Sequence, residues 1–143
     1  MNYYKIHKPE AIDLILRYNL NFIEGNIVKY ILRSPFKWDR IGDLEKALYY
    51  ASLLKEDNIR ASFDESELDS YSDLSYLERE AVEMTINGFF FHTVINDPEG
   101  NKIEEYRENY IEKIIKLAIE ERKENQPSSF MLNTENILKS FTK

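Results

Sequence analysis

Residues 25–50 read GNIVKYILRSPFKWDRIGDLEKALYY, and this stretch predicts a helical hairpin with its turn at Ser34-Pro35. Proline lacks the amide that a helix interior needs, so the first helix should stop there. The polar residues at helical spacing are Asn26, Lys29 and Arg33 before the turn, and Asp43, Lys46 and Tyr50 after it. Two short helices joined tightly lie antiparallel, so we expect these two faces to meet.

Such a pair of faces suits a phosphate-bearing ligand better than a hydrophobic core. The predicted binding residues of the hairpin are Asn26, Lys29, Tyr30, Arg33, Lys37, Lys46 and Tyr50. Arg33 is the expected anchor, because its planar fork matches two phosphate oxygens. Asp43 either orients Arg33 or Lys46, or holds a magnesium ion in a catalytic role. The alternative is a solvated helix face on which Asp43 forms an ordinary surface ion pair.

Gly25 adds a second indication of close approach. Glycine in a helix costs about 1 kcal/mol relative to alanine, so its presence beside Asn26 favours a backbone that a ligand or a neighbouring helix approaches closely.

Composition narrows the class of protein. The chain has 143 residues and no cysteine, which excludes disulfides, thiol catalysis and cysteine-ligated metals. Its two histidines are far apart, and no apolar run has the length of a membrane span or a signal peptide. We therefore expect a soluble, cytoplasmic protein.

Charge is unevenly distributed along the chain. The net charge is −7, which argues against general nucleic-acid binding. Residues 1–60 nevertheless hold 10 Lys/Arg against 8 Asp/Glu, whereas residues 61–143 hold 9 against 18. This asymmetry favours a local anion site in the first half of the chain.

Hydrophobic periodicity predicts an all-α fold, a small helical bundle. Five main helices are expected at about residues 9–19, 22–33, 39–56, 73–94 and 102–123, with a short helix within 133–141. Residues 1–56 would form a three-helix unit, 57–72 a solvated acidic connector, and 73–143 a longer helical hairpin, all in one compact domain. The Phe89–Phe91 cluster and the expected Tyr106 and Tyr110 face suggest a homo-oligomer.

The first third of the chain resembles a phage-encoded family of unknown function called SaV-like. The matching elements are Pro9-Glu10-Ala11-Ile12-Asp13, Gly25-Asn26-Ile27-Val28-Lys29-Tyr30-Ile31-Leu32-Arg33, Lys37, and Asp43-Leu44-Glu45-Lys46-Ala47-Leu48-Tyr49-Tyr50. His7 matches a position that often carries His or Tyr in that family. Some members are described as nucleotide kinases that act on nucleoside monophosphates, so the resemblance implies a nucleotide site, with His7 among its residues.

The chain lacks a Walker-type phosphate loop, so phosphoryl transfer would require another way to hold ATP and Mg²⁺. Two functions stay open: a nucleoside monophosphate kinase without that loop, and a non-catalytic phage protein. The second would sequester a nucleotide signal or inhibit a host defence protein, in the cytoplasm of the infected cell.

A lesser alternative comes from carboxylate pairs in the second half. Glu80 and Glu83, and Glu105 and Glu108, stand at i, i+3 in the fourth and fifth expected helices. This pattern resembles the magnesium-binding helices of all-α nucleoside-triphosphate pyrophosphatases. In so acidic a chain the alternative is two solvated helix faces.

Overall fold

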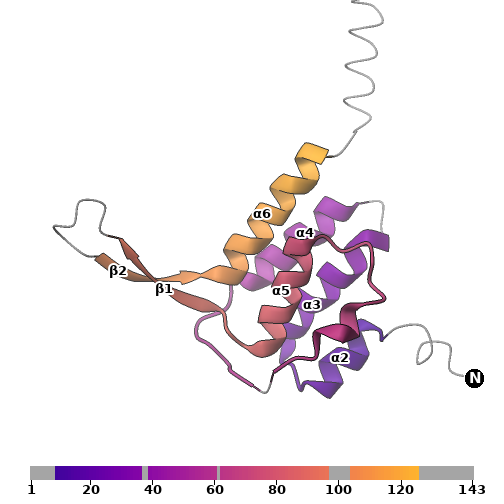
Figure 1. The fold of residues 1–143 in the computed structure, drawn as a ribbon, viewed down its shortest axis with the longest axis horizontal. Coiled ribbons are helices and arrows are strands. Elements are labelled where there is room, and N and C mark those ends of the chain that lie inside the picture. Colours follow the sequence, from indigo (N-terminus) through magenta and orange to yellow (C-terminus); the bar gives the residue numbers. More distant parts are fainter. Residues whose placement is uncertain (1–8, 37–38, 61, 97–103, 126–143) are drawn as a thin grey trace, which may run out of the picture.

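A computed structural model describes residues 9–36, 39–60, 62–96 and 104–125 of the chain. Over these residues the protein is mostly helical, with one small antiparallel sheet. The elements are α2 (Ala11–Arg17), α3 (Phe22–Arg33), η1 (Ser34–Phe36), α4 (Arg40–Ala51), η2 (Glu65–Leu68), α5 (Tyr76–Asn87), β1 (Phe91–Asn96), β2 (Glu104–Asn109) and α6 (Tyr110–Asn125), where η marks a 3-10 helix. Figure 1 shows the helices gathered into a bundle from which β1 and β2 extend as an arm.

The predicted hairpin of α3 and α4 is confirmed, and local signals explain its limits. At the start of α3 the Asn21 side chain accepts a hydrogen bond from the Glu24 amide at 2.8 Å. The Glu24 side chain in turn accepts one from the Asn21 amide at 3.0 Å. This reciprocal pair satisfies amides that the first helical turn leaves without partners. Regular helix ends at Arg33, two residues before Pro35.

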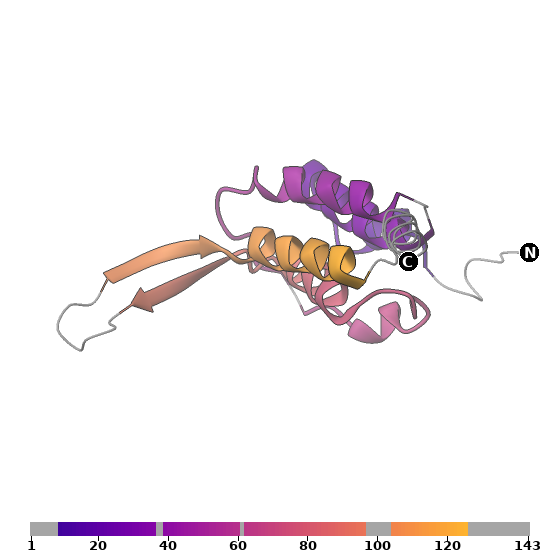
Figure 2. The same ribbon diagram turned by 90° about the horizontal axis from the view of Figure 1, so that it is seen from above.

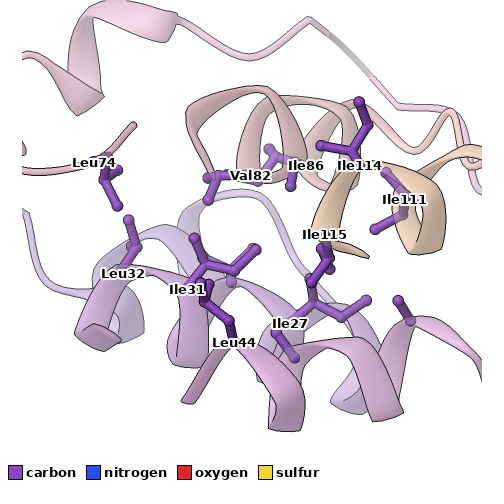
Figure 3. Close-up of a cluster of buried hydrophobic side chains, with 14 of the residues drawn as sticks. Ile27, Ile31, Leu32, Leu44, Leu74, Val82, Ile86, Ile111, Ile114 and Ile115 are labelled. Atoms are coloured by element: carbon purple, nitrogen blue, oxygen red, sulfur yellow. The ribbon is translucent and has the colours of Figure 1, made fainter. Parts of the chain in front are cut away.

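The core lies between α3 and α4 on one side and α5 and α6 on the other (Figure 3). Aliphatic side chains at helical spacing fill it: Ile27, Ile31, Leu44, Val82, Ile86, Ile111 and Ile115. Burying one such side chain contributes about 1.5–3 kcal/mol. These apolar stripes therefore attach the α3–α4 hairpin to the rest of the bundle.

A buried carboxylate ties three helices together at one end of the core. Glu78 of α5 is 1 % exposed and pairs with Arg40 of α4 and Arg122 of α6, each at 2.9 Å. Burial by itself would raise the pKa of Glu78. Hydrogen bonds from Arg122, from the Ser75 backbone and from Arg40 outweigh burial, so the pKa of Glu78 lies below its ordinary value. We call these three side chains the Glu78 triad.

A second buried carboxylate fastens the segment that follows α4. Glu24 is fully buried and accepts hydrogen bonds from Arg60 at 2.6 Å and from Asn58 at 2.8 Å. Arg60 also donates to the carbonyl of Ile86 near the end of α5. The segment passes so close to Gly88 that a Cβ there would lie 1.8 Å from the Asn58 carbonyl oxygen.

The expectation of a solvated connector over residues 57–72 is wrong in one respect. The described part is irregular, as predicted, and holds only the short η2 helix. Its apolar side chains are nevertheless core residues, since Phe63, Leu68 and Tyr71 are at most 8 % exposed. These three core residues could not be predicted, because isolated apolar residues among Asp, Glu and Ser form no periodic pattern.

The all-α expectation fails at Phe91–Asn96 and Glu104–Asn109, which are strands. Helix α5 ends at Asn87, where Gly88 takes the left-handed conformation (φ 84°) that closes many helices. Phe91–Asn96 then pairs antiparallel with Glu104–Asn109. The consecutive β-branched residues Thr93, Val94 and Ile95 explain the strand. This sheet is a peripheral arm, and the bundle itself is helical, as predicted.

The fifth helix begins later than predicted. It runs from Tyr110, and Tyr106 belongs to β2, so the expected helical face of Tyr106 and Tyr110 does not form. The predicted short helix within 133–141 lies outside the described residues. In the described part of the chain, no helix has the length and apolar content needed to cross a membrane.

Candidate functional site

Three cations surround one tyrosine ring where α3 and α4 pack together. From the centre of the Tyr30 ring, Lys29 Nζ lies at 4.7 Å, Arg33 Cζ at 5.3 Å and Lys46 Nζ at 5.5 Å. Lys29 and Arg33 belong to α3, whereas Lys46 comes from α4, so the hairpin brings together residues separated by the turn. The attraction between a cation and the negative face of an aromatic ring explains this arrangement.

Asp43 links the cations of the two helices. Its side chain is 5 % exposed and lies 3.3 Å from Arg33 Nε and 4.0 Å from Lys46 Nζ. The two cations remain in contact with water, with side-chain exposures of 42 % for Arg33 and 56 % for Lys46. Asp43 is thus paired with one cation from each helix, and the two roles predicted for it, orienting those cations or holding a magnesium ion, stay predictions.

Aromatic rings extend the site along α3 and α4. Tyr50 lies nearly parallel to Tyr30, with ring centres 6.1 Å apart and an interplanar angle of 13°. Phe22 and Tyr49 approach Tyr50 edge-on, with ring centres 5.9 and 5.2 Å away. Phe22 and Tyr49 are 74 % and 59 % exposed. We call Phe22, Tyr30, Tyr49 and Tyr50 the aromatic strip.

An open pocket of about 450 Å³ lies beside the strip. Its lining residues are Tyr30, Gly42, Glu45, Lys46, Tyr49 and Tyr50. Glu45 and Tyr49 are lining residues that the sequence did not predict, although both stand one residue from a predicted site position. A Cβ at Gly42 would lie 2.2 Å from an oxygen of Asp39, the residue that caps α4, so any larger residue there would displace the capping side chain.

Other positions singled out in the sequence do not join the cluster around Tyr30. The Asn26 side chain donates to the Phe22 carbonyl at 2.8 Å, within its own helix. Gly25 is buried, and a Cβ there would lie 3.3 Å from Ile15 Cδ1 of α2. The close approach predicted at Gly25 is therefore that of a neighbouring helix. His7 and Lys37 lie outside the described residues.

The carboxylate pairs of the second half do not form two facing helical pairs. Glu80 and Glu83 belong to α5, but Glu105 and Glu108 belong to strand β2, so the predicted pyrophosphatase-like arrangement is wrong. Burial, followed by repulsion from Glu65 and Glu80, raises the pKa of Glu83. Among the described residues, no group of three or more His, Cys, Asp or Glu side chains is placed to hold a metal ion.

Comparison with known protein families gives a match over the first third of the chain. The model of a family described as a protein of unknown function (DUF3310) matches residues 2–52. No curated protein and no solved structure matches the chain. The matched segment runs from before α2 to the end of α4 and holds every hairpin residue predicted to bind a ligand. The likeness of this segment to an uncharacterised family is thus confirmed, without any function attached to it.

Proposed function

We propose that the face formed by α3 and α4 binds a nucleotide. The observation that carries this proposal is the convergence of Lys29, Arg33 and Lys46 on Tyr30, beside a pocket that Lys46 and the aromatic strip share. Cations supply charge-assisted hydrogen bonds to phosphate oxygens, and tyrosine rings supply a surface on which a base stacks. A purely structural ion-pair network has no need of exposed aromatic rings on its rim.

The surrounding charge supports an anionic ligand at this face. The chain carries a net charge of −7, yet three cations gather around one ring here. Asp43 and Glu45 offset part of this charge, Asp43 from a buried position beside Arg33 and Lys46, and Glu45 from the lining of the pocket. A phosphate group on the exposed side would complete the pairing of these cations.

Asp43 also bears on whether the site catalyses. Each of its oxygens faces a cation, Oδ2 toward Arg33 and Oδ1 toward Lys46. A carboxylate used in this way favours a protein that holds a nucleotide without turning it over. We therefore place sequestration of a nucleotide, in a phage-encoded protein of the infected cell, ahead of phosphoryl transfer to a nucleoside monophosphate.

One assay separates these functions. The purified protein is titrated with the common ribonucleotides and deoxyribonucleotides by calorimetry, with and without Mg²⁺. It is then incubated with ATP, Mg²⁺ and each nucleoside monophosphate. Saturable binding without diphosphate product supports sequestration, and formation of diphosphates supports the kinase. The absence of binding by any nucleotide would overturn the proposal.

A matched pair of variants locates the site in that assay. Lys46→Ala removes the cation that lines the pocket and should weaken binding. Lys116→Ala removes a similarly exposed lysine of α6. Lys116 pairs with Glu112 at 3.8 Å, and neither residue lines the pocket. The second variant should bind like the unchanged protein.

A further inference from the structure

The arm formed by β1 and β2 projects away from the helices in both views (Figures 1 and 2). Among the described residues, the arm contacts α6 and the segment that follows α4 at its base. Asp57 accepts hydrogen bonds from the amides of Phe90 and Phe91 at 2.8 and 2.9 Å, and Arg107 lies 3.4 Å from the same carboxylate. The His92 ring stacks on Tyr110 with centres 4.1 Å apart.

A ribbon of two strands is marginally stable in water without further strands or a supporting helix. Here the ribbon extends past its base, and large apolar side chains on it face water. Ile95 is 61 % exposed and Tyr106 is 52 % exposed. The arm therefore has the properties of an element that becomes fully stable in an assembly.

The two edges of the arm differ in charge. Strand β2 reads EEYREN and has four charged residues in six, the usual protection of an edge against pairing. Strand β1 reads FHTVIN, contains no Asp, Glu, Lys or Arg, and is rich in β-branched residues. The β1 edge is thus unprotected, whereas like charges would repel a second β2.

The register shows which backbone groups this edge presents. The Tyr110 amide donates to the Phe90 carbonyl at 2.7 Å, so Phe90 and Tyr110 form a hydrogen-bonded pair. In an antiparallel ladder such pairs alternate with non-hydrogen-bonded ones. The N–H and C=O groups of Thr93 and Ile95 consequently point away from β2, and no described residue hydrogen-bonds to them.

We propose that β1 pairs antiparallel with β1 of a second copy of this chain. Two identical strands pair in this way about a two-fold axis, so one surface suffices for both partners. The product is a four-stranded sheet with the charged β2 strands at its outer edges and the uncharged β1 strands at its centre. This pairing satisfies the free backbone groups of Thr93 and Ile95 and does not depend on any ligand at the α3–α4 face.

The test compares two proline substitutions at a cross-strand pair. Ile95 and Glu105 stand opposite each other, and the amide of each points away from the partner strand. Ile95→Pro removes a donor from the β1 edge, and Glu105→Pro removes the equivalent donor from the β2 edge. Masses are measured by analytical ultracentrifugation at micromolar concentration, with circular dichroism to confirm that both variants retain their helices.

The unchanged chain and Glu105→Pro should sediment as even-numbered assemblies, and Ile95→Pro should halve the mass. A cysteine adds an independent measurement, because the natural chain has none. Thr93→Cys should form a disulfide-linked dimer under a glutathione redox buffer, whereas Arg107→Cys on β2 should not. A monomeric unchanged chain, or an assembly that Ile95→Pro leaves intact, would overturn the proposal, and a heterologous peptide would then be the remaining partner for β1.

Discussion

Two clusters in this protein use the same chemical groups, one carboxylate between two cations, in opposite settings. In the Glu78 triad the carboxylate is fully buried, and the side chains of Arg40 and Arg122 are only 23 % and 24 % exposed. In the α3–α4 site, Asp43 is similarly buried, but Arg33 and Lys46 are 42 % and 56 % exposed. Exposure of the cations, and not the composition of the cluster, separates a structural anchor from a surface that can bind an anion.

Geometry supports the same distinction. The Glu78 triad joins three helices through short contacts and is closed by the backbone of Ser75 and the carbonyl of Asp73. The cations at Asp43 lie farther from it and spread over the Tyr30 ring, beside an open pocket.

Removing the charge of Glu78 should be the most damaging change. Glu78→Gln leaves two partly buried arginines without their counter-ion, and breaking a buried ion pair costs about 3 kcal/mol or more. Urea denaturation followed by circular dichroism measures the free energy of unfolding. Asp43→Asn is the matched control and should cost only about 1 kcal/mol, since its cations reach water. Equal losses of unfolding free energy would show that the two clusters contribute equally to stability.

The contribution of Glu78 should also depend on pH in a defined direction. Its pKa in the folded protein lies below the ordinary value of 4.5, so the folded state binds the proton less tightly than the unfolded state. The stability that Glu78 provides is therefore complete at neutral pH and is lost as the pH falls through the folded-state pKa. The difference in unfolding free energy between the natural chain and Glu78→Gln should shrink below about pH 4.5. A difference that stays constant down to pH 3 would contradict this.

Arg33→Ala should weaken nucleotide binding by roughly ten- to a hundred-fold, because a charge-assisted hydrogen bond contributes about 1.5–3 kcal/mol. Titration calorimetry with the best-binding nucleotide measures the change. Arg107→Ala is a close control, since Arg107 is also exposed, lies 3.4 Å from Asp57 and covers the ring of Phe91 at 5.0 Å. Unchanged affinity in a folded Arg33→Ala protein would reduce the site to a solvated helix face.

The aromatic strip should contribute less to nucleotide affinity than Arg33 does. Tyr30→Leu keeps an apolar side chain of similar size but removes the ring, and loss of one stacking surface costs about 1 kcal/mol, or about five-fold in affinity. The same calorimetric titration reports it. Tyr76→Leu changes an exposed tyrosine of α5 and should have no effect. If both substitutions lower the affinity equally, the loss does not depend on the position of the tyrosine, and the aromatic strip is not a binding element.

Gly25→Ala should change least. The added methyl group would meet the end of the Ile15 side chain at 3.3 Å, and the gain in helix propensity of about 1 kcal/mol offsets this contact. Thermal unfolding should therefore shift little, and nucleotide affinity should not change, because Gly25 faces α2. Reduced affinity at unchanged stability would place Gly25 in the path of the ligand.

The hairpin was predictable because its determinants are local. Asn21 and Glu24 cap α3, Pro35 interrupts it, and the i, i+3 spacing of Asn26 and Lys29 needs no information from the rest of the chain. The prediction of helix at β2 is wrong for a related reason. Residues 102–109 contain apolar residues at intervals that suit a helix, and only pairing with β1 makes Glu104–Asn109 a strand.

By itself, the sequence determined the helical character of the chain, the limits of α3 and α4, and the residues that share a face of this hairpin. These follow from backbone chemistry and side-chain spacing within a few residues. Packing between distant segments places Phe63 and Leu68 in the core and brings Gly25 against α2. It also encloses Glu78, whereas Lys46, a partner of Asp43, lines an open pocket. Burial and ion pairing depend on segments distant in sequence, so the cost of desolvating a charge is set only when those segments pack together.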